Sequence, residues 1–112
     1  MSHWNVEMWE DESGNSPIRK FLDSLSDEQV IGLAKTIKLL GECGNQLRMP
    51  HSKALERGIF ELRERRYGFR IYYCFRGGRI VLLLCGGDKD SQVRDIKKAR
   101  EIIRALKQEE QK

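Results

Sequence analysis

The sequence predicts an α+β fold in which an antiparallel β-sheet is covered by helices on one face. Three observations lead to this expectation: two helical segments follow an alternating segment near the start, three apolar segments follow one another between residues 59 and 86, and a last helical segment begins near Ser91. Strands joined by short turns pair antiparallel, and helices with one apolar side need a sheet to cover. The expected order of elements is β-α-α-β-β-β-α.

The first half of the chain contains one strand and two helices. Residues 3–10 alternate apolar and polar side chains, as a half-buried strand does. Ser16 and Pro17 have the types favoured at a helix N-cap and at the first helical position, so a short helix is expected through Leu25. A second helix opens at Ser26 and ends at the glycines of 41–44; its expected inward residues are Val30, Leu33, Ala34, Ile37 and Leu40.

The second half contains the rest of the sheet and a last helix. Residues 45–58 have no sustained period and include a proline, so a long surface loop is expected there. Strands are expected at about 59–65, 69–76 and 79–86, and a helix from Ser91 to Lys107. The inward face of that helix is expected to consist of Val93, Ile96, Ala99, Ile103 and Leu106.

Length and composition indicate a single domain over residues 1–112. No apolar run approaches the roughly 18 residues that span a bilayer, and the start lacks the layout of a signal peptide, so no membrane association is expected. An odd number of cysteines in apolar segments favours a reducing, cytoplasmic location. These cysteines lack CxxC spacing, which argues against a zinc site, and no phosphate-binding glycine motif is present.

Positive charge is concentrated in one segment. Residues 59–79 contain six arginines and two glutamates, a net +4 that equals the net charge of the whole chain. A patch of this kind indicates a polyanionic partner, most often a nucleic acid.

The apolar pattern of the hairpin predicts which face these arginines occupy. Directly opposed residues of two antiparallel strands share a face, so Phe60 and Leu62 join the apolar set of the next strand only if paired residue numbers have an odd sum. Arg65 opposite Arg70 would satisfy this rule. The opposite face then collects one cluster, which is expected to be free of helices: Arg63, Arg65, Arg70, Tyr72 and Arg76. Such a cluster repels itself but suits a phosphate chain; the alternative is a solvated face paired with glutamates.

Several motifs resemble the RelE/ParE toxin superfamily, and more narrowly its HigB-type "addiction module killer" branch. They are the ELR of residues 61–63, the YGFRIYY of 67–73 and the LLLCGGDKDSQ of 82–92 followed by DI and a basic helix, with SPIRKFLDSL at 16–25 similar to the opening of the family. The resemblance implies a small microbial-ribonuclease fold and the toxin of a type II toxin–antitoxin module. It also implies metal-free cleavage of mRNA, often on the ribosome, with no organic cofactor. The implied partners are the ribosome, mRNA and a cognate antitoxin, a helix-turn-helix protein from the same operon.

The resemblance also assigns site residues. Arg63 and Arg70 match phosphate-binding arginines of the family, and Tyr72 matches a tyrosine that could stack on a base or position the phosphate; filling the rim of the sheet is the alternative. Lys89 lies at the end of the last strand, where it could stabilise phosphate charge or act as an acid. The alternative for Lys89 is a turn lysine paired with Asp88 or Asp90.

Further residues are expected to contact RNA. They are Arg65, Arg76, His51 and Lys53. His51 is the plausible histidine general base, although a loop histidine is often only a surface residue. If His51 is not the general base, lysines could transfer the proton. Glu61 is a further candidate for the base on that face, and pairing with Arg63 is the alternative role of Glu61. The glycines at 86 and 87 suggest a turn or bulge.

Three functions remain open from the sequence. The first is a ribosome-dependent mRNA endonuclease toxin, which the arginine and tyrosine face favours. The second is a ParE-like inhibitor of DNA gyrase without nuclease activity, and the third a non-toxic nucleic-acid-binding module. The shared fold does not separate them.

Overall fold

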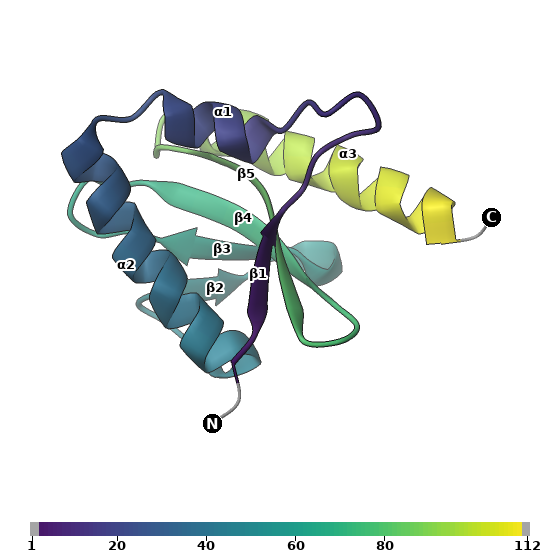
Figure 1. Ribbon diagram of the computed structural model, residues 1–112, viewed down its shortest axis with the longest axis horizontal. Helices are drawn as coiled ribbons and strands as arrows, with labels where there is room; N and C mark the ends of the chain where they lie inside the picture. The colour runs from purple at the N-terminus through teal and green to yellow at the C-terminus, as the bar shows by residue number, and fades with distance from the viewer. Residues whose placement is uncertain (1–2, 111–112) are drawn as a thin grey trace.

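The computed structural model describes residues 3–110, which form a five-stranded mixed sheet and three α-helices (Figure 1). The strands are β1 (Asn5–Met8), β2 (Ser52–Ala54), β3 (Phe60–Arg63), β4 (Arg70–Arg76) and β5 (Ile80–Gly87). The helices are α1 (Pro17–Asp23), α2 (Asp27–Cys43) and α3 (Gln92–Glu110), with short 3-10 turns η1 (Gly44–Gln46) and η2 (Glu56–Gly58). The α+β class and the expected helices are confirmed, with boundary shifts of a few residues.

Local capping explains where the first two helices begin and end. The Ser16 hydroxyl accepts the backbone N–H of Arg19, and Pro17 occupies the first turn of α1. At α2, Ser26 and Gln29 form a reciprocal capping box. The α2 helix stops at Gly44, which has a φ of 53° and lies so close to the indole of Trp4 that a Cβ would overlap the ring.

The sheet order is β1-β5-β4-β3-β2. All neighbours pair antiparallel except β1 and β5, which pair parallel. The expected purely antiparallel sheet is therefore corrected at one edge. Strand β2 corrects the expected loop over 45–58: it is three residues long, too short for alternation to be visible in the sequence.

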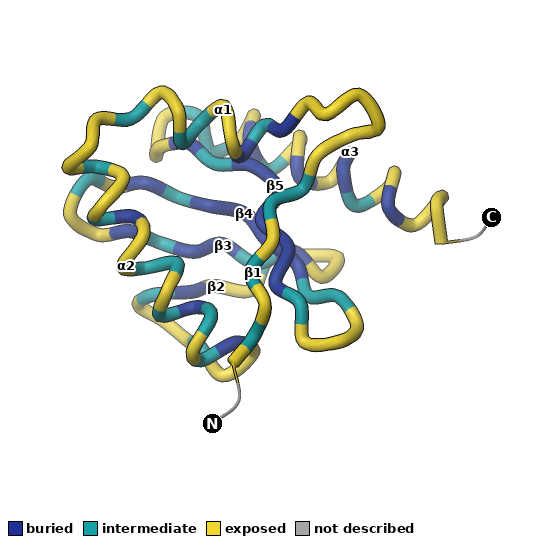
Figure 2. The backbone as a smooth tube through the Cα atoms, in the orientation of Figure 1, coloured by how far each residue is buried: buried dark blue, intermediate teal, exposed yellow. Residues whose placement is uncertain are grey.

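Helices cover both faces of the sheet, not one. Helices α1 and α2 pack on the face of Ile71, Tyr73 and Leu83, whereas α3 packs on the face of Tyr72 and Leu84. The physical reason lies in β5, which is buried on both sides along most of its length, so that each side needs a covering layer. Figure 2 shows this central strand as a nearly continuous buried segment.

The inward faces of the two long helices are partly corrected. Leu33 and Leu40 of α2 and Ala99 of α3 are buried as expected, but Val93 is 86% exposed and Val30 is 36% exposed. Ala34, which was also expected to face inward, is exposed as well, whereas Val30 and Val93 lie near the start of their helices.

The β3–β4 register follows the expected odd-sum rule, with Leu62 opposite Ile71 and Arg63 opposite Arg70. The suggested pairing of Arg65 with Arg70 is wrong, because β3 ends at Arg63. The chain turns between these strands around the buried carboxylate of Glu64, which accepts the backbone N–H groups of Arg66 and Tyr67. No helix within residues 3–110 is long and apolar enough to cross a bilayer.

Candidate functional site

Two rows of residues cross the sheet on the face that α3 covers in part. One row consists of Lys53, Glu61, Tyr72 and Cys85, each opposite the next on neighbouring strands. The adjacent row consists of Arg63, Arg70 and Gly87. Because directly opposed residues share a face, the two arginines lie side by side at the end of the sheet where α3 begins.

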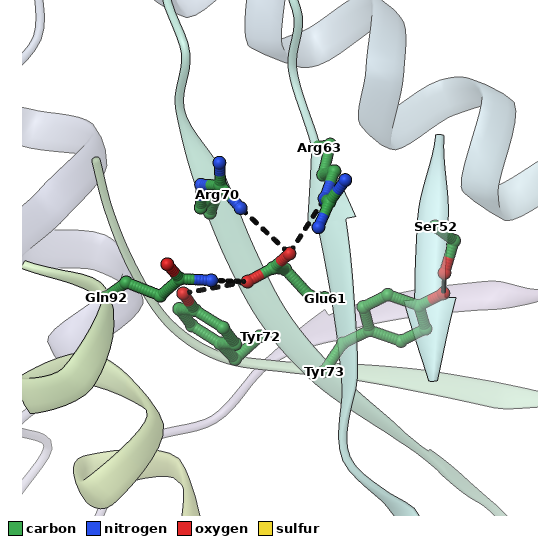
Figure 3. Close-up of polar contacts among 7 residues, drawn as sticks. All are labelled: Ser52, Glu61, Arg63, Arg70, Tyr72, Tyr73 and Gln92. Atoms are coloured by element: carbon green, nitrogen blue, oxygen red, sulfur yellow. Dashed lines mark hydrogen bonds and ion pairs between the residues drawn. The ribbon is translucent and has the colours of Figure 1, made fainter. Parts of the chain in front are cut away.

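Glu61 is the centre of a polar network that joins both rows (Figure 3). Its Oε1 accepts hydrogen bonds from Arg63 Nε at 2.8 Å and from Arg70 at 3.0 Å. Its Oε2 accepts hydrogen bonds from Gln92 Nε2 at 2.8 Å and from the Tyr72 hydroxyl at 3.2 Å. The Glu61 side chain has no exposed surface, so four donors replace the water that an ionised carboxylate requires.

These donors keep Glu61 ionised. Burial by itself would raise the pKa of Glu61, but the hydrogen bonds of Arg63 and Gln92 and the charges of Arg70 and Arg63 outweigh it and lower the pKa below its ordinary value. A fully buried carboxylate with a lowered pKa is a poor general base. Glu61 instead fixes the two guanidinium groups, which confirms the expected partnership with Arg63.

The Tyr72 side chain cannot stack on a base, which corrects one of its two expected roles. It is completely buried, and burial together with the Glu61 charge strongly raises the pKa of its hydroxyl. Tyr72 therefore remains protonated and donates to Glu61 from below the arginines.

Arg63 and Arg70 are held at the surface, not enclosed. Their side chains are 28% and 18% exposed. Arg63 is held through Nε, which leaves its two terminal nitrogens for another acceptor. Arg70 Nε is buried without a hydrogen-bond partner in residues 3–110. An unpaired buried donor costs about 1–3 kcal/mol, so this arginine is not placed for stability alone.

Two predicted RNA-binding arginines lie outside this cluster. Arg65 is exposed in the turn after β3. Arg76 points to the same face as Arg70 but lies at the other end of β4, where it pairs with Glu110 at 2.9 Å. The expectation of one contiguous arginine cluster on the strands is therefore wrong for these two residues, because β3 ends before Arg65 and the length of β4 separates Arg76 from Arg70.

His51 and Lys53 border the arginine pair along the edge strand. The carbonyl of His51 accepts the backbone N–H of Arg63 at 2.8 Å, which places His51 directly across from that arginine. His51 is half-buried, and Lys53 is exposed opposite Glu61. Both residues therefore lie beside the arginines that the structure brings together.

Lys89 is exposed in the turn between β5 and α3, two positions after Gly87. It forms no ion pair with another residue of the range 3–110, so the pairing with Asp88 or Asp90 is not observed. The Asp88 carboxylate instead accepts the backbone N–H groups of Asp90 and Ser91 and shapes the turn into α3.

Gly86 and Gly87 allow close packing at the end of β5. A Cβ on Gly86 would overlap the ring of Phe21, and one on Gly87 would overlap the side chains of Asp95 and Ser91. The two glycines thus let α1 and α3 approach the strand beside Arg70.

Sequence reasoning did not assign a role to Gln92 or Asp95. Gln92 binds Glu61 from the first turn of α3, and the buried Asp95 accepts the hydroxyl of Ser91 one turn earlier. Both residues belong to the quoted GGDKDSQ and DI motifs. Their position in these family motifs could have marked them as candidate functional residues. The side chains that they contact become visible only where α3 packs against the sheet.

The fold is similar to that of solved RelE chains. The chain is similar in structure to a chain of the toxin–antitoxin complex RelBE2 from Mycobacterium tuberculosis, with a TM-score of 0.58, 18% identity, and coverage of 80% of this chain and 94% of that one. It is similar to a chain of the archaeal RelE–RelB complex from Pyrococcus horikoshii, with a TM-score of 0.59, 15% identity, and coverage of 79% and 97%. At these identities the likeness establishes the fold.

The sequence places the chain in a family. A family model described as phage-derived protein Gp49-like (DUF891) matches residues 20–108, so the chain belongs to the Gp49-like family. An uncharacterized protein from Haemophilus influenzae is 46% identical over 55 residues. That match covers 48% of this chain and 56% of the relative, so the chain aligns with about half of the curated relative's length.

Proposed function

We propose that this protein is the toxin of a type II toxin–antitoxin module and that it cuts mRNA as a metal-free endoribonuclease on the ribosome. Membership in the Gp49-like family and the fold of RelE-type chains support a toxin role. Within this proposal the protein belongs to the HigB-type branch, which its ELR, YGFRIYY and LLLCGGDKDSQ motifs resemble.

One observation in particular supports the nuclease hypothesis. Arg63 and Arg70 stand side by side at the surface, and a single buried carboxylate orients both. Two like charges directly opposed across a hairpin destabilise it unless something offsets them. Glu61 offsets one charge and leaves the pair with a net +1 for a phosphate group.

Cleavage requires no co-reactant. The ribose 2′ oxygen attacks the adjacent phosphorus, and the bond from phosphorus to the 5′ oxygen breaks. The 2′-OH proton passes to a base, and the 5′ oxygen receives a proton, which yields a cyclic phosphate and a 5′-OH. Arg63 and Arg70 stabilise the charge that develops on the phosphorane, a contribution of about 10²–10³ in rate per donor in comparable sites.

The surrounding residues take the remaining roles. His51, across from Arg63, is the proposed base, with the neighbouring Lys53 as the lysine alternative. Lys89 protonates the leaving oxygen or adds positive charge beside it. Tyr72 holds Glu61, and Arg65 contacts the RNA backbone from the turn.

The proposed protein partner is an antitoxin. The structural neighbours from Mycobacterium tuberculosis and Escherichia coli are chains of toxin–antitoxin complexes. The Escherichia coli chain is 18% identical with a TM-score of 0.53, and the match covers 78% of this chain and 96% of that one. A helix-turn-helix protein from the same operon, acting in the cytoplasm, would silence the toxin.

Induced expression in bacteria tests the proposal. Growth arrest with discrete mRNA cuts in primer extension is expected of the native protein, and substitution of both Arg63 and Arg70 by alanine should remove both effects. Arrest without cuts but with an SOS response would contradict the nuclease proposal. Normal growth of cells that make the folded native protein would contradict the toxin proposal.

A further inference from the structure

A second basic surface lies beside α3, away from Arg63 and Arg70. Helix α3 and the η2 turn enclose a groove of about 470 Å³ lined by Glu56, Arg57, Lys97, Arg100, Glu101 and Arg104. An adjoining hollow shares three of these arginines and adds Lys107. This α3 groove has five cations and two carboxylates, a net +3 against +4 for the whole chain.

Most of these cations have no partner within residues 3–110. Arg57, Lys97, Arg104 and Lys107 form no ion pair there. Arg100 approaches Glu56 at 3.9 Å, and both side chains are exposed. Exposed pairs of this kind contribute little, so the groove attracts anions.

The backbone of η2 adds a second observation. Arg57 has a φ of 61° and a ψ of 33°, the left-handed conformation that L-residues other than glycine seldom adopt. A glycine would occupy this position with less strain. Strained non-glycine residues cluster at functional sites, and the strained Arg57 is one of the residues that line the groove.

The cations of α3 form one stripe. Lys97, Arg100, Arg104 and Lys107 are spaced by three, four and three residues, which puts them on one side of the helix over about 15 Å. A row of cations at such intervals matches a phosphate backbone better than a single small anion.

The α3 groove also lies near the arginine pair along the axis of α3. Gln92 of α3 contacts Glu61, and Arg100 lies eight residues further along the same helix, beside Glu56. At 1.5 Å per residue this is about 12 Å along the axis. A strand bound at Arg63 and Arg70 therefore reaches the α3 groove within a few nucleotides.

We propose that the α3 groove binds the phosphate backbone of the substrate RNA strand on one side of the cleaved phosphate. This subsite proposal rests on the proposed nuclease function. The ligand of the subsite is single-stranded RNA, which the groove recognises by charge and not by base sequence. Loss of the groove would weaken binding of long strands and leave the chemistry at Arg63 and Arg70 intact.

The decisive variant is Arg57→Gly, because it should raise or preserve thermal stability while weakening RNA binding. Arg79→Gly is the matched control: Arg79 has the same φ of 61° and the same charge, but it lies over the ring of Trp4, which packs in the core on the α2 side of the sheet. Binding is measured by fluorescence anisotropy with a labelled single-stranded RNA oligonucleotide and with a dinucleotide.

We expect Arg57→Gly to weaken binding of the long strand about fivefold at 0.1 M salt and to reduce the salt slope by roughly 0.7, the value for one lost phosphate contact. The double variant Arg100→Gln with Arg104→Gln should do so more strongly. Dinucleotide binding should be unchanged in all of them, and Arg79→Gly should match the native protein with both ligands.

Three results would overturn the groove proposal. The first is that Arg57→Gly and Arg79→Gly bind the long single strand with equal affinity. The second is that the Arg57→Gly substitution weakens binding of duplex RNA more than binding of single-stranded RNA. The third is that the groove variants bind an acidic polypeptide such as polyglutamate more weakly than the native protein does, with RNA affinity unchanged. That result would make the groove a binding site for an acidic protein. Long-strand binding that depends on Arg57 in a protein that cuts no RNA would support the groove and reject the nuclease function, so the two failures are distinct.

Discussion

Arg63 and Arg70 face each other across β3 and β4 and donate to the same oxygen of Glu61, at 2.8 and 3.0 Å. The shared acceptor sets the separation and direction of both guanidinium groups, because neither can turn without breaking its bond. A flexible pair of cations loses side-chain entropy when it binds a phosphate, about 0.5–1.5 kcal/mol for each side chain. Here folding has already ordered the pair, so less of that cost remains for the binding step.

Removal of either arginine should abolish most of the cleavage. For Arg63→Ala or Arg70→Ala we expect a loss of about 10²–10³ in kcat, the range for one lost donor to transition-state charge. Cleavage of a model RNA measures it. Arg66→Ala is the control, since Arg66 is exposed in the adjacent turn over the Tyr67 ring, and a comparable loss there would show that bulk charge alone matters.

Glu61→Gln should destabilise the fold, because it leaves two partly buried guanidinium groups without a counter-charge. Breaking one side of a buried ion pair costs about 3 kcal/mol. Urea unfolding at neutral pH checks this expectation. An unchanged midpoint would mean that the network contributes nothing to stability.

The Glu61→Gln variant should also change how the free energy of unfolding depends on pH in the acid range. The pKa of Glu61 is lower in the folded chain than its reference value of 4.5, so the ion pairs stabilise fully above that pH. This contribution disappears as the pH falls through the folded-state pKa. The native protein should therefore lose its stability advantage over Glu61→Gln below about pH 4.5, as thermal unfolding across pH 3–6 would show. A constant difference across that range would contradict the assignment.

Tyr72→Phe should affect stability more than catalysis. The substitution removes one donor to Glu61, worth about 1 kcal/mol, and the buried ring keeps its packing. We expect kcat to fall less than tenfold, because the hydroxyl cannot reach RNA. A loss as large as that of Arg63→Ala would show that Tyr72 becomes accessible when substrate binds.

Substitutions at Lys89 can distinguish charge stabilisation from proton donation. Lys89→Ala should slow cleavage with no change in melting temperature, because the side chain is exposed and unpaired within residues 3–110. Lys89→Arg keeps the charge but cannot release a proton near neutral pH. Rescue by arginine indicates charge stabilisation, and failure of rescue indicates an acid. Full activity of Lys89→Ala would remove this residue from the mechanism.

Gly87→Ala tests the packing that brings α3 to the site. The added methyl group would overlap Asp95 and Ser91, and overpacking of this kind costs about 1–3 kcal/mol. Gly77→Ala is the control, since a Cβ there meets no atom within 4 Å. Equal melting temperatures for the two variants would contradict the close approach of α3 to β5.

Local sequence signals were enough to predict the helices, the main strands and the side of the sheet on which Arg63 and Arg70 lie. Capping residues, helical spacing and the two-residue period of strands are local signals, and the odd-sum pairing follows from burying Leu62 with Ile71. The family motifs were present as well, including Gln92 and Asp95, although their contacts were not visible.

What surrounds those arginines depends on long-range packing, which no local pattern in the sequence states. The placement of α3 on their face, the burial of Glu61 and Tyr72, the separation of Arg76 and the groove beside Arg57 each depend on where distant segments pack. A local pattern states which side of a strand is apolar, but not which helix covers it. Burial, and with it the protonation and reach of each polar group, is a property of that packing.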